Sequence, residues 1–212
     1  MPVNYTVVRS AGRRSLTLKV RGGEVYVYAP VLVSQSAIDR FVTSHQNWIN
    51  RQLTKVRHNI NFDLEKDDHV YLLGERYDLE VITGTANAII LEADRIILKG
   101  RSYSSITRNF RQYLCDIISE HVNDLKNQWN RDFTFSYRFY RSRWGCCYRE
   151  KRHIVLNYLL GCVPFDCIDE VICHEMAHLK VANHQAAFYE ELSRLYPDYR
   201  KAVKRLKSYT VE

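Results

Sequence analysis

The twelve residues Cys173–His184, CHEMAHLKVANH, constrain the fold more than any other part of the chain. They contain His174 and His178, and side chains four residues apart share one face of an α-helix. Most of the preceding residues are apolar and Pro164 suits a helix start, so the pattern predicts a helix from residue 164 through residue 180. Because an unpaired polar group costs free energy inside a protein, imidazoles in such a helix need a partner.

A metal ion would supply that partner. In HExxH sequences the two histidines bind one Zn²⁺, and the glutamate after the first histidine reaches a water molecule on the ion. That glutamate is Glu175, which we predict to be the catalytic general base. A catalytic zinc ion needs a third protein ligand. We predict His184, with Glu190 or Glu191 on the following helix as the alternative. The predicted metal ligands are His174, His178 and His184.

Apolar periodicity predicts an α+β fold in two parts. Residues 1–100 read as a β-rich N-terminal subdomain with one helix over 34–58. Alternation over residues 15–30, around Gly22-Gly23, predicts a β-hairpin. Four further strands are expected at 70–73, 77–82, 88–91 and 95–98. Residues 101–212 form the second predicted domain, with helices expected at 106–129, 164–180, 185–195 and 198–207 and strands at 133–139 and 154–156.

Composition narrows the class of protein. No apolar run reaches the roughly 18 to 20 residues that a bilayer span requires, so we expect no membrane partner. The six cysteines have no CxxC spacing, and two of them are adjacent, which is a poor geometry for pairing. We expect reduced thiols and a cytoplasmic protein. The net charge of +7 is compatible with a phosphate-bearing partner, although most surface charge only keeps a protein soluble.

Several motifs occur together, in a fixed order, with HExxH. They are Arg143-Trp144-Gly145-Cys146-Cys147, Ile154-Val155-Leu156-Asn157, Pro164, Ile168-Asp169, Asn183-His184, Phe188 and Pro197-Asp198-Tyr199. In this order the sequence resembles the YgjP-like metallopeptidase-domain family, relatives of the SprT-like and WLM zincins, over nearly the whole chain. Cys146 is a departure, because the family usually has Ser there. The resemblance implies a zincin-like catalytic domain over 101–212. It also implies an edge strand, expected near Ile154–Asn157, that holds an extended substrate beside the active-site helix.

We therefore predict a zinc-dependent hydrolase, a metallopeptidase acting on peptides or proteins. Glu175 would take a proton from a metal-activated water as that water attacks a carbonyl. Arg143, His153 and Tyr189 are candidates for stabilising the resulting oxyanion. One alternative, which the resemblance implies, is a nucleoside triphosphate (UTP) pyrophosphohydrolase using the same metal site.

A second alternative is a zinc-stapled module that binds nucleic acid. It is suggested by basic residues interleaved with aromatic ones between positions 137 and 152. These residues are Arg138, Arg141, Arg143, Arg149, Lys151 and Arg152, with Tyr137, Phe139, Tyr140 and Tyr148. A structural zinc site needs no glutamate beside its ligands, so the position of Glu175 favours catalysis.

Overall fold

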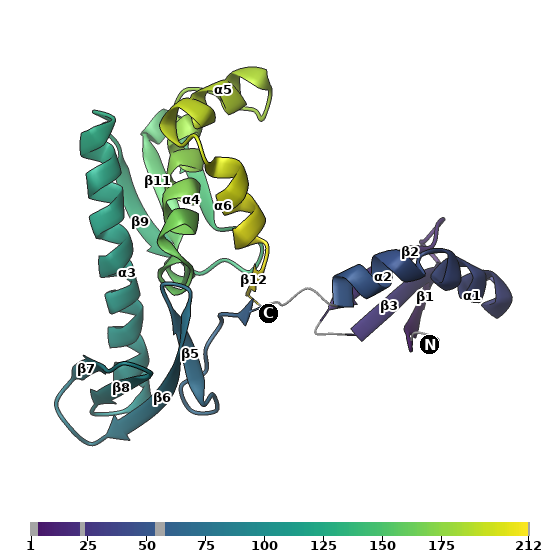
Figure 1. Ribbon diagram of the computed structural model, residues 1–212, viewed down its shortest axis with the longest axis horizontal. Coiled ribbons are helices and arrows are strands. Elements are labelled where there is room, and N and C mark those ends of the chain that lie inside the picture. The colour runs from purple at the N-terminus through teal and green to yellow at the C-terminus, as the bar shows by residue number, and fades with distance from the viewer. Residues whose placement is uncertain (1–3, 22–23, 54–57, 212) are drawn as a thin grey trace. The chain divides into compact units, whose positions relative to one another are not determined.

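The alternating segment near the N-terminus forms a β-hairpin in the computed structural model, which describes residues 4–21, 24–53 and 58–211 (Figure 1). Strand β2 (Thr17–Arg21) pairs antiparallel with β3 (Glu24–Pro30), and the predicted turn at 22–23 lies outside the described residues. Strand β1 (Thr6–Ser10) pairs with β3 in parallel, so that β3 is central. Every second residue of β3 is buried, as the alternation predicts.

The helix predicted over 34–58 is divided in two, α1 (Gln35–Ser44) and α2 (Gln46–Leu53), and residues 54–57 lie outside the described part. The hydroxyl of Ser34 caps α1 by accepting a hydrogen bond from the backbone N–H of Ala37. At the break, Nδ1 of His45 and the hydroxyl of Ser44 both donate to the carbonyl oxygen of Phe41, at 2.8 and 2.9 Å. These side chains occupy the carbonyl that the helix would use for its next backbone bond.

Three sheets lie between residues 58 and 211. The four-stranded sheet has the order β5-β6-β8-β7, with strands His69–Leu72, Glu75–Thr83, Arg95–Gly100 and Ala88–Leu91. The three-stranded sheet has the order β10-β11-β9, with strands Gly145–Tyr148, His153–Asn157 and Thr134–Arg138. The two-stranded sheet pairs β4 (His58–Asn59) with β12 (Tyr209–Thr210). Strand β10 was not expected from the sequence.

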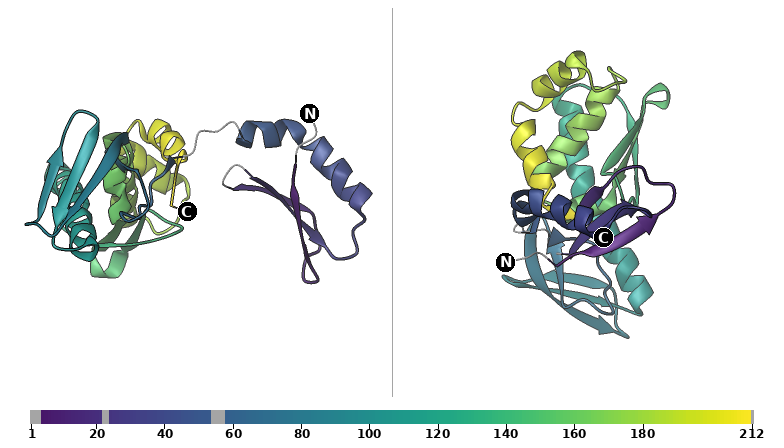
Figure 2. Two further views of the ribbon diagram at one scale, coloured as in Figure 1. Left: turned by 90° about the horizontal axis from the view of Figure 1, so that it is seen from below. Right: turned by 90° about the vertical axis from the view of Figure 1, so that its right-hand side faces the viewer.

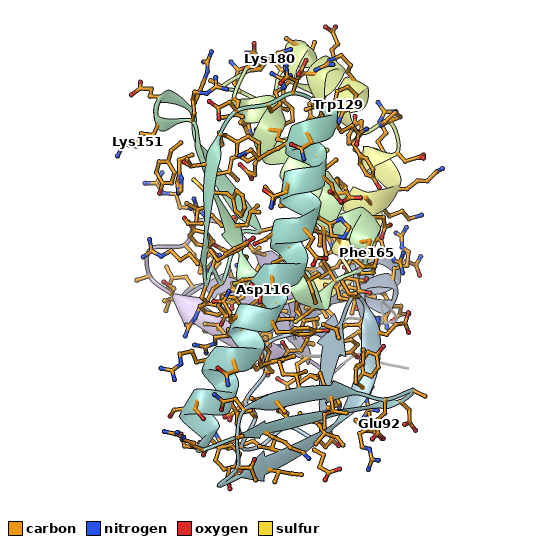
Figure 3. All side chains as sticks on the ribbon, turned by 90° about the vertical axis from the view of Figure 1, so that its left-hand side faces the viewer. Glu92, Asp116, Trp129, Lys151, Phe165 and Lys180 are labelled. Atoms are coloured by element: carbon orange, nitrogen blue, oxygen red, sulfur yellow. The ribbon has the colours of Figure 1, made fainter. Side chains whose placement is uncertain are left out.

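The helices of this part are α3 (Tyr103–Gln128), α4 (Phe165–His178), α5 (Ala186–Leu195) and α6 (Tyr199–Leu206). The four-stranded sheet lies at the N-terminal end of α3, and α4 lies between β11 and α6 (Figures 1 and 2). Figure 3 shows the length of α3: Glu92, in the turn between β7 and β8, is at one end, and Trp129 and Lys180 are at the other. None of the described helices has the length and apolar character needed to cross a bilayer.

Contacts divide the chain into two units, residues 1–57 and 58–212. This division differs from the sequence-based one near residue 100. Ile96 and Leu98 of β8 belong to the same hydrophobic core as Ile106 and Phe110 of α3. A boundary at residue 100 would cut through that core, whereas the first unit has a separate core around Val27. The mixture of helices and small sheets agrees with the predicted α+β class.

Candidate metal centre

Three imidazole rings converge at the C-terminal end of α4. Nε2 of His184 lies 3.1 Å from Nε2 of His178 and 3.1 Å from Nε2 of His174. One nitrogen from each ring lies within 4.8 Å of the other two, and no other group of described residues has a comparable arrangement of possible ligands. Two nitrogens bound tetrahedrally to one Zn²⁺ at 2.0–2.1 Å would be roughly 3.3 Å apart. The three rings therefore fit a zinc ion.

The end of α4 explains how His184 reaches the other two rings. The helix ends at His178, two residues before the predicted end. The backbone N–H groups of Lys180 and Val181 both donate to the carbonyl oxygen of Ala177, at 3.0 Å, which turns the chain back. Nδ1 of His178 donates to the carbonyl oxygen of Val181 at 3.0 Å. In a neutral ring this leaves the lone pair on Nε2, which faces the other histidines.

Phe188 on α5 supports all three rings. It is fully buried, and its ring centroid lies 4.9, 4.5 and 4.6 Å from those of His174, His178 and His184. Burial lowers the pKa of His174 to about 4, and burial also lowers the pKa of His178. Both rings are therefore neutral at neutral pH, which is the form that binds a metal. Phe188 is one of the residues that carry the family resemblance, but its contact with the three rings could not be predicted, because a phenylalanine on an amphipathic helix is most often a core residue.

Glu175 lies one position beyond His174 and is 7% exposed. Its carboxylate packs against the backbone of Gly145, where a side-chain Cβ would come within 2.8 Å of its Oε1. Both residues line a cavity of about 420 Å³. Apart from His174, the rest of the lining is Arg143, Trp144, Glu170, Val171, Val203, Leu206, Lys207 and Tyr209. Burial raises the pKa of Glu175 to about 7, with a contribution from Glu170, while Arg143 acts in the opposite direction.

The alternative third ligands do not approach the three rings. Glu190 is exposed on α5. The carboxylate of Glu191 contacts the guanidinium of Arg131, Nζ of Lys180 at 3.1 Å and Nη2 of Arg194 at 2.8 Å. The hydrogen bond from Arg194 first, and then that from Lys180, lower the pKa of Glu191 to about 2, against the opposing effect of burial. Glu191 thus forms ion pairs with residues at or just after the C-terminal ends of α3, α4 and α5.

The three candidates for oxyanion stabilisation have different surroundings. Arg143 lines the same cavity as Glu175. Both ring nitrogens of His153 are engaged by the hydroxyls of Thr134 and Ser136, at 2.8 and 2.9 Å. Tyr189 is 44% exposed, and the described lining of the cavity does not include it. Of the three residues, only Arg143 shares a cavity with the carboxylate.

The edge strand beside α4 is β10, not β11. The family resemblance implies an edge strand near Ile154–Asn157, but β11 pairs with β10 on one side and with β9 on the other. Within the described residues β10 pairs with β11 alone, so its other side is a free edge, and it also contacts α4. The sequence does not predict strand β10, because Gly145-Cys146-Cys147 follows a loop and lacks the apolar alternation of a strand.

Cys146 and Cys147 are not in the group that could hold a metal, and burial raises the pKa of Cys147 to about 11. Several of the basic residues of the 137–152 segment make contacts within the protein. Arg138 and Arg143 lie over the ring of Tyr140, at 5.9 and 5.5 Å, and Arg152 donates to the carbonyl oxygen of Asp132.

Nearly the whole chain is similar to a known protein family. Residues 14–209 match the family model described as YgjP-like, metallopeptidase domain. A comparison with curated protein sequences gives no significant match. Among solved structures, the chain is similar to a crystal structure of a Wss1 mutant from Saccharomyces cerevisiae. That similarity has a TM-score of 0.37 and 15% sequence identity, over 60% of this chain and 94% of that one.

Proposed function

The chain belongs to the YgjP-like metallopeptidase-domain family, and from this premise we propose that it is a zinc-dependent hydrolase that cleaves peptide bonds. The observation that carries the proposal is the convergence of three imidazoles, His174, His178 and His184, beside a buried carboxylate. These three residues would hold the ion. Zinc would lower the pKa of a water molecule to about 7 and polarise the carbonyl that is attacked.

Side chains of the protein would supply the proton transfer and the oxyanion stabilisation. Glu175 would accept the proton of the attacking water at its carboxylate and later deliver it to the leaving amine. Gly145, which has no side chain, leaves the space that this carboxylate occupies. Arg143, in the same cavity, would stabilise the negative charge that develops on the carbonyl oxygen.

The free edge of β10 supports an extended peptide as the substrate. An unpaired strand edge can bind a peptide by main-chain hydrogen bonds, while nearby pockets select side chains. Strand β10 begins at Gly145, so a peptide paired with it would pass beside Glu175. We propose a reducing, cytoplasmic setting, because all six cysteines are free.

The alternative substrate is a nucleoside triphosphate such as UTP. Two cationic residues, Arg143 and Lys207, line the cavity that also contains Glu175, and both are exposed. Cations of this kind could bind phosphates. The peptide is favoured because β10 offers a backbone edge, which a nucleotide would not use.

The proposal can be tested on protein purified from cells grown with zinc. Its metal content is measured, and it is then incubated with a peptide library and, separately, with nucleoside triphosphates. We expect about one zinc per chain and cleavage of peptides. Glu175→Gln should retain zinc and the fold but lose turnover. Nucleotide hydrolysis without peptide cleavage would favour the pyrophosphohydrolase. Unchanged function in Glu175→Gln, with salt-sensitive binding of DNA or RNA, would favour the nucleic-acid-binding module.

A further inference from the structure

Glu170 is a buried carboxylate to which the mechanism above assigns no role. It lies on α4 one turn before His174, lines the cavity beside Glu175 and is 3% exposed. Among the described residues no hydrogen bond reaches its carboxylate. The nearest polar partner is Nδ1 of His174, 3.8 Å from Oε1. Burying a carboxylate without a partner costs free energy, so its presence at this position calls for an explanation.

The orientation of the His174 ring provides one. Its Nε2 faces Nε2 of His184 at 3.1 Å, so its Nδ1 is on the opposite side of the ring. If Nε2 binds a cation, the neutral ring carries its proton on Nδ1. Nδ1 lies 3.8 Å from Oε1 of Glu170, which is four residues earlier on the same face of the helix.

We propose that Glu170 is a positioning residue for the metal centre: its carboxylate accepts a hydrogen bond from Nδ1 of His174 and holds Nε2 toward the other two imidazoles. The inference rests on the proposed function, since it requires a metal at the three histidines. The 3.8 Å separation must shorten by about 1 Å to reach an ordinary hydrogen bond, and a small rotation of either side chain is enough.

His178, another of the proposed metal ligands, already makes a hydrogen bond of this kind through its Nδ1. Nδ1 of His178 donates to the carbonyl oxygen of Val181 at 3.0 Å, which fixes that ring with Nε2 facing inward. His174 has no backbone carbonyl in this role among the contacts of the described residues, and Glu170 occupies the corresponding place. Partners of this kind, one shell beyond the ligands, set ring orientation and raise metal affinity.

Zinc affinity of the full chain tests the proposal without any knowledge of the substrate. The dissociation constant is measured by competition with a chromophoric chelator for the wild type, Glu170→Gln, Glu170→Leu and the control Glu120→Gln. Glu120 is an exposed residue of α3, so its substitution should leave zinc affinity within about twofold. We expect Glu170→Leu to bind zinc about 10- to 100-fold more weakly. Glu170→Gln keeps a hydrogen-bond acceptor but loses the charge, so we expect an intermediate loss.

Two further measurements separate positioning from packing. The visible spectrum of the cobalt(II) form should change in both Glu170 variants, because the His174 ring is held differently. Metal-free Glu170→Gln should melt at or above the wild-type temperature, because a buried unpaired charge is removed. A packing role predicts the reverse: lower stability with an unchanged zinc affinity and an unchanged cobalt spectrum.

The outcomes also separate this inference from the proposed function. If wild-type protein binds neither zinc nor cobalt, both are wrong. If the wild type binds zinc and both Glu170 variants bind it equally well, the positioning role is wrong, but the hydrolase proposal stands.

Discussion

A Cβ atom on Gly145 would lie 2.8 Å from both Cγ and Oε1 of Glu175. Such separations are shorter than any normal contact, so the carboxylate can occupy its position only because residue 145 has no side chain. The first residue of the edge strand thus determines where the proposed general base lies.

Gly145→Ala should therefore displace the Glu175 carboxylate while leaving the three histidines in place. A misplacement of about 1 Å can reduce a rate on the order of a hundredfold, so we expect a loss of that order in turnover with zinc affinity retained. The control is Gly12→Ala, because an added Cβ there meets no atom within 4 Å. Peptide cleavage and chelator competition measure the two quantities. Full activity in Gly145→Ala would contradict the proposed role of Glu175.

Asn157 should stabilise the segment that leads into β10. It is fully buried, and its Nδ2 donates to the carbonyl oxygens of Tyr140 and Arg143, at 2.8 and 3.2 Å. Asn157→Ala leaves these acceptors unpaired, so we expect the free energy of unfolding to fall by about 2–4 kcal/mol in urea denaturation. The same change at exposed Asn59 should cost less than about 1 kcal/mol. Equal losses at the two sites would count against this account.

The third metal ligand can be identified by comparing His184→Ala with Glu191→Gln. Loss of His184 removes one of three ring nitrogens, so zinc affinity should fall by more than the roughly 10- to 100-fold typical of an outer-shell partner. Glu191→Gln should keep zinc affinity but lower the melting temperature, because Arg131, Lys180 and Arg194 lose a shared anion. Zinc loss in Glu191→Gln with none in His184→Ala would reverse the assignment.

His121 should make stability depend on pH. Its Nδ1 lies 2.9 Å from Oδ1 of Asp169, and that hydrogen bond raises the pKa of His121 because it outweighs burial, which acts in the opposite direction. A folded-state pKa above the unfolded value near 6.5 gives a stabilisation that is complete at lower pH and is lost as pH rises through the folded pKa. His121→Phe, which keeps the ring packing against Phe165, should cost about 1 kcal/mol at pH 5.5 and less at pH 8 in metal-free protein.

The matching control is Asp169→Asn, which removes the charge that His121 faces. Its free energy of unfolding should also fall further below the wild-type value at pH 5.5 than at pH 8. A cost for His121→Phe that is the same at both pH values would mean that the pair contributes packing alone.

The local elements of the site could be predicted from the sequence because short-range patterns determine them. The spacing of His174 and His178 requires a helix, and α4 is present over Phe165–His178. The strands after residue 68 follow their alternation closely. The proximity of His184 was predicted from the same twelve residues, and its ring does converge with the other two.

Features that depend on long-range packing could not be predicted in this way. The cavity beside Glu175 takes Val203 and Lys207 from the α6 region, and no local pattern brings these residues to α4. The division of the chain after residue 57 depends on which core Ile96 joins, and the alternation of β8 is compatible with either. Strand β10 was missed because pairing with β11, and not residue preference, makes it a strand.

The free edge of β10 also has a bearing on self-association. A row of unpaired backbone groups accepts any extended chain, including one from another copy of the same protein. At four residues, Gly145–Tyr148, the strand is too short to offer more than a few such bonds, and Arg149 and Lys151 follow it directly. Brief length and adjacent positive charge are the usual protections of an exposed edge against aggregation, so this free edge should remain compatible with a monomer at high concentration.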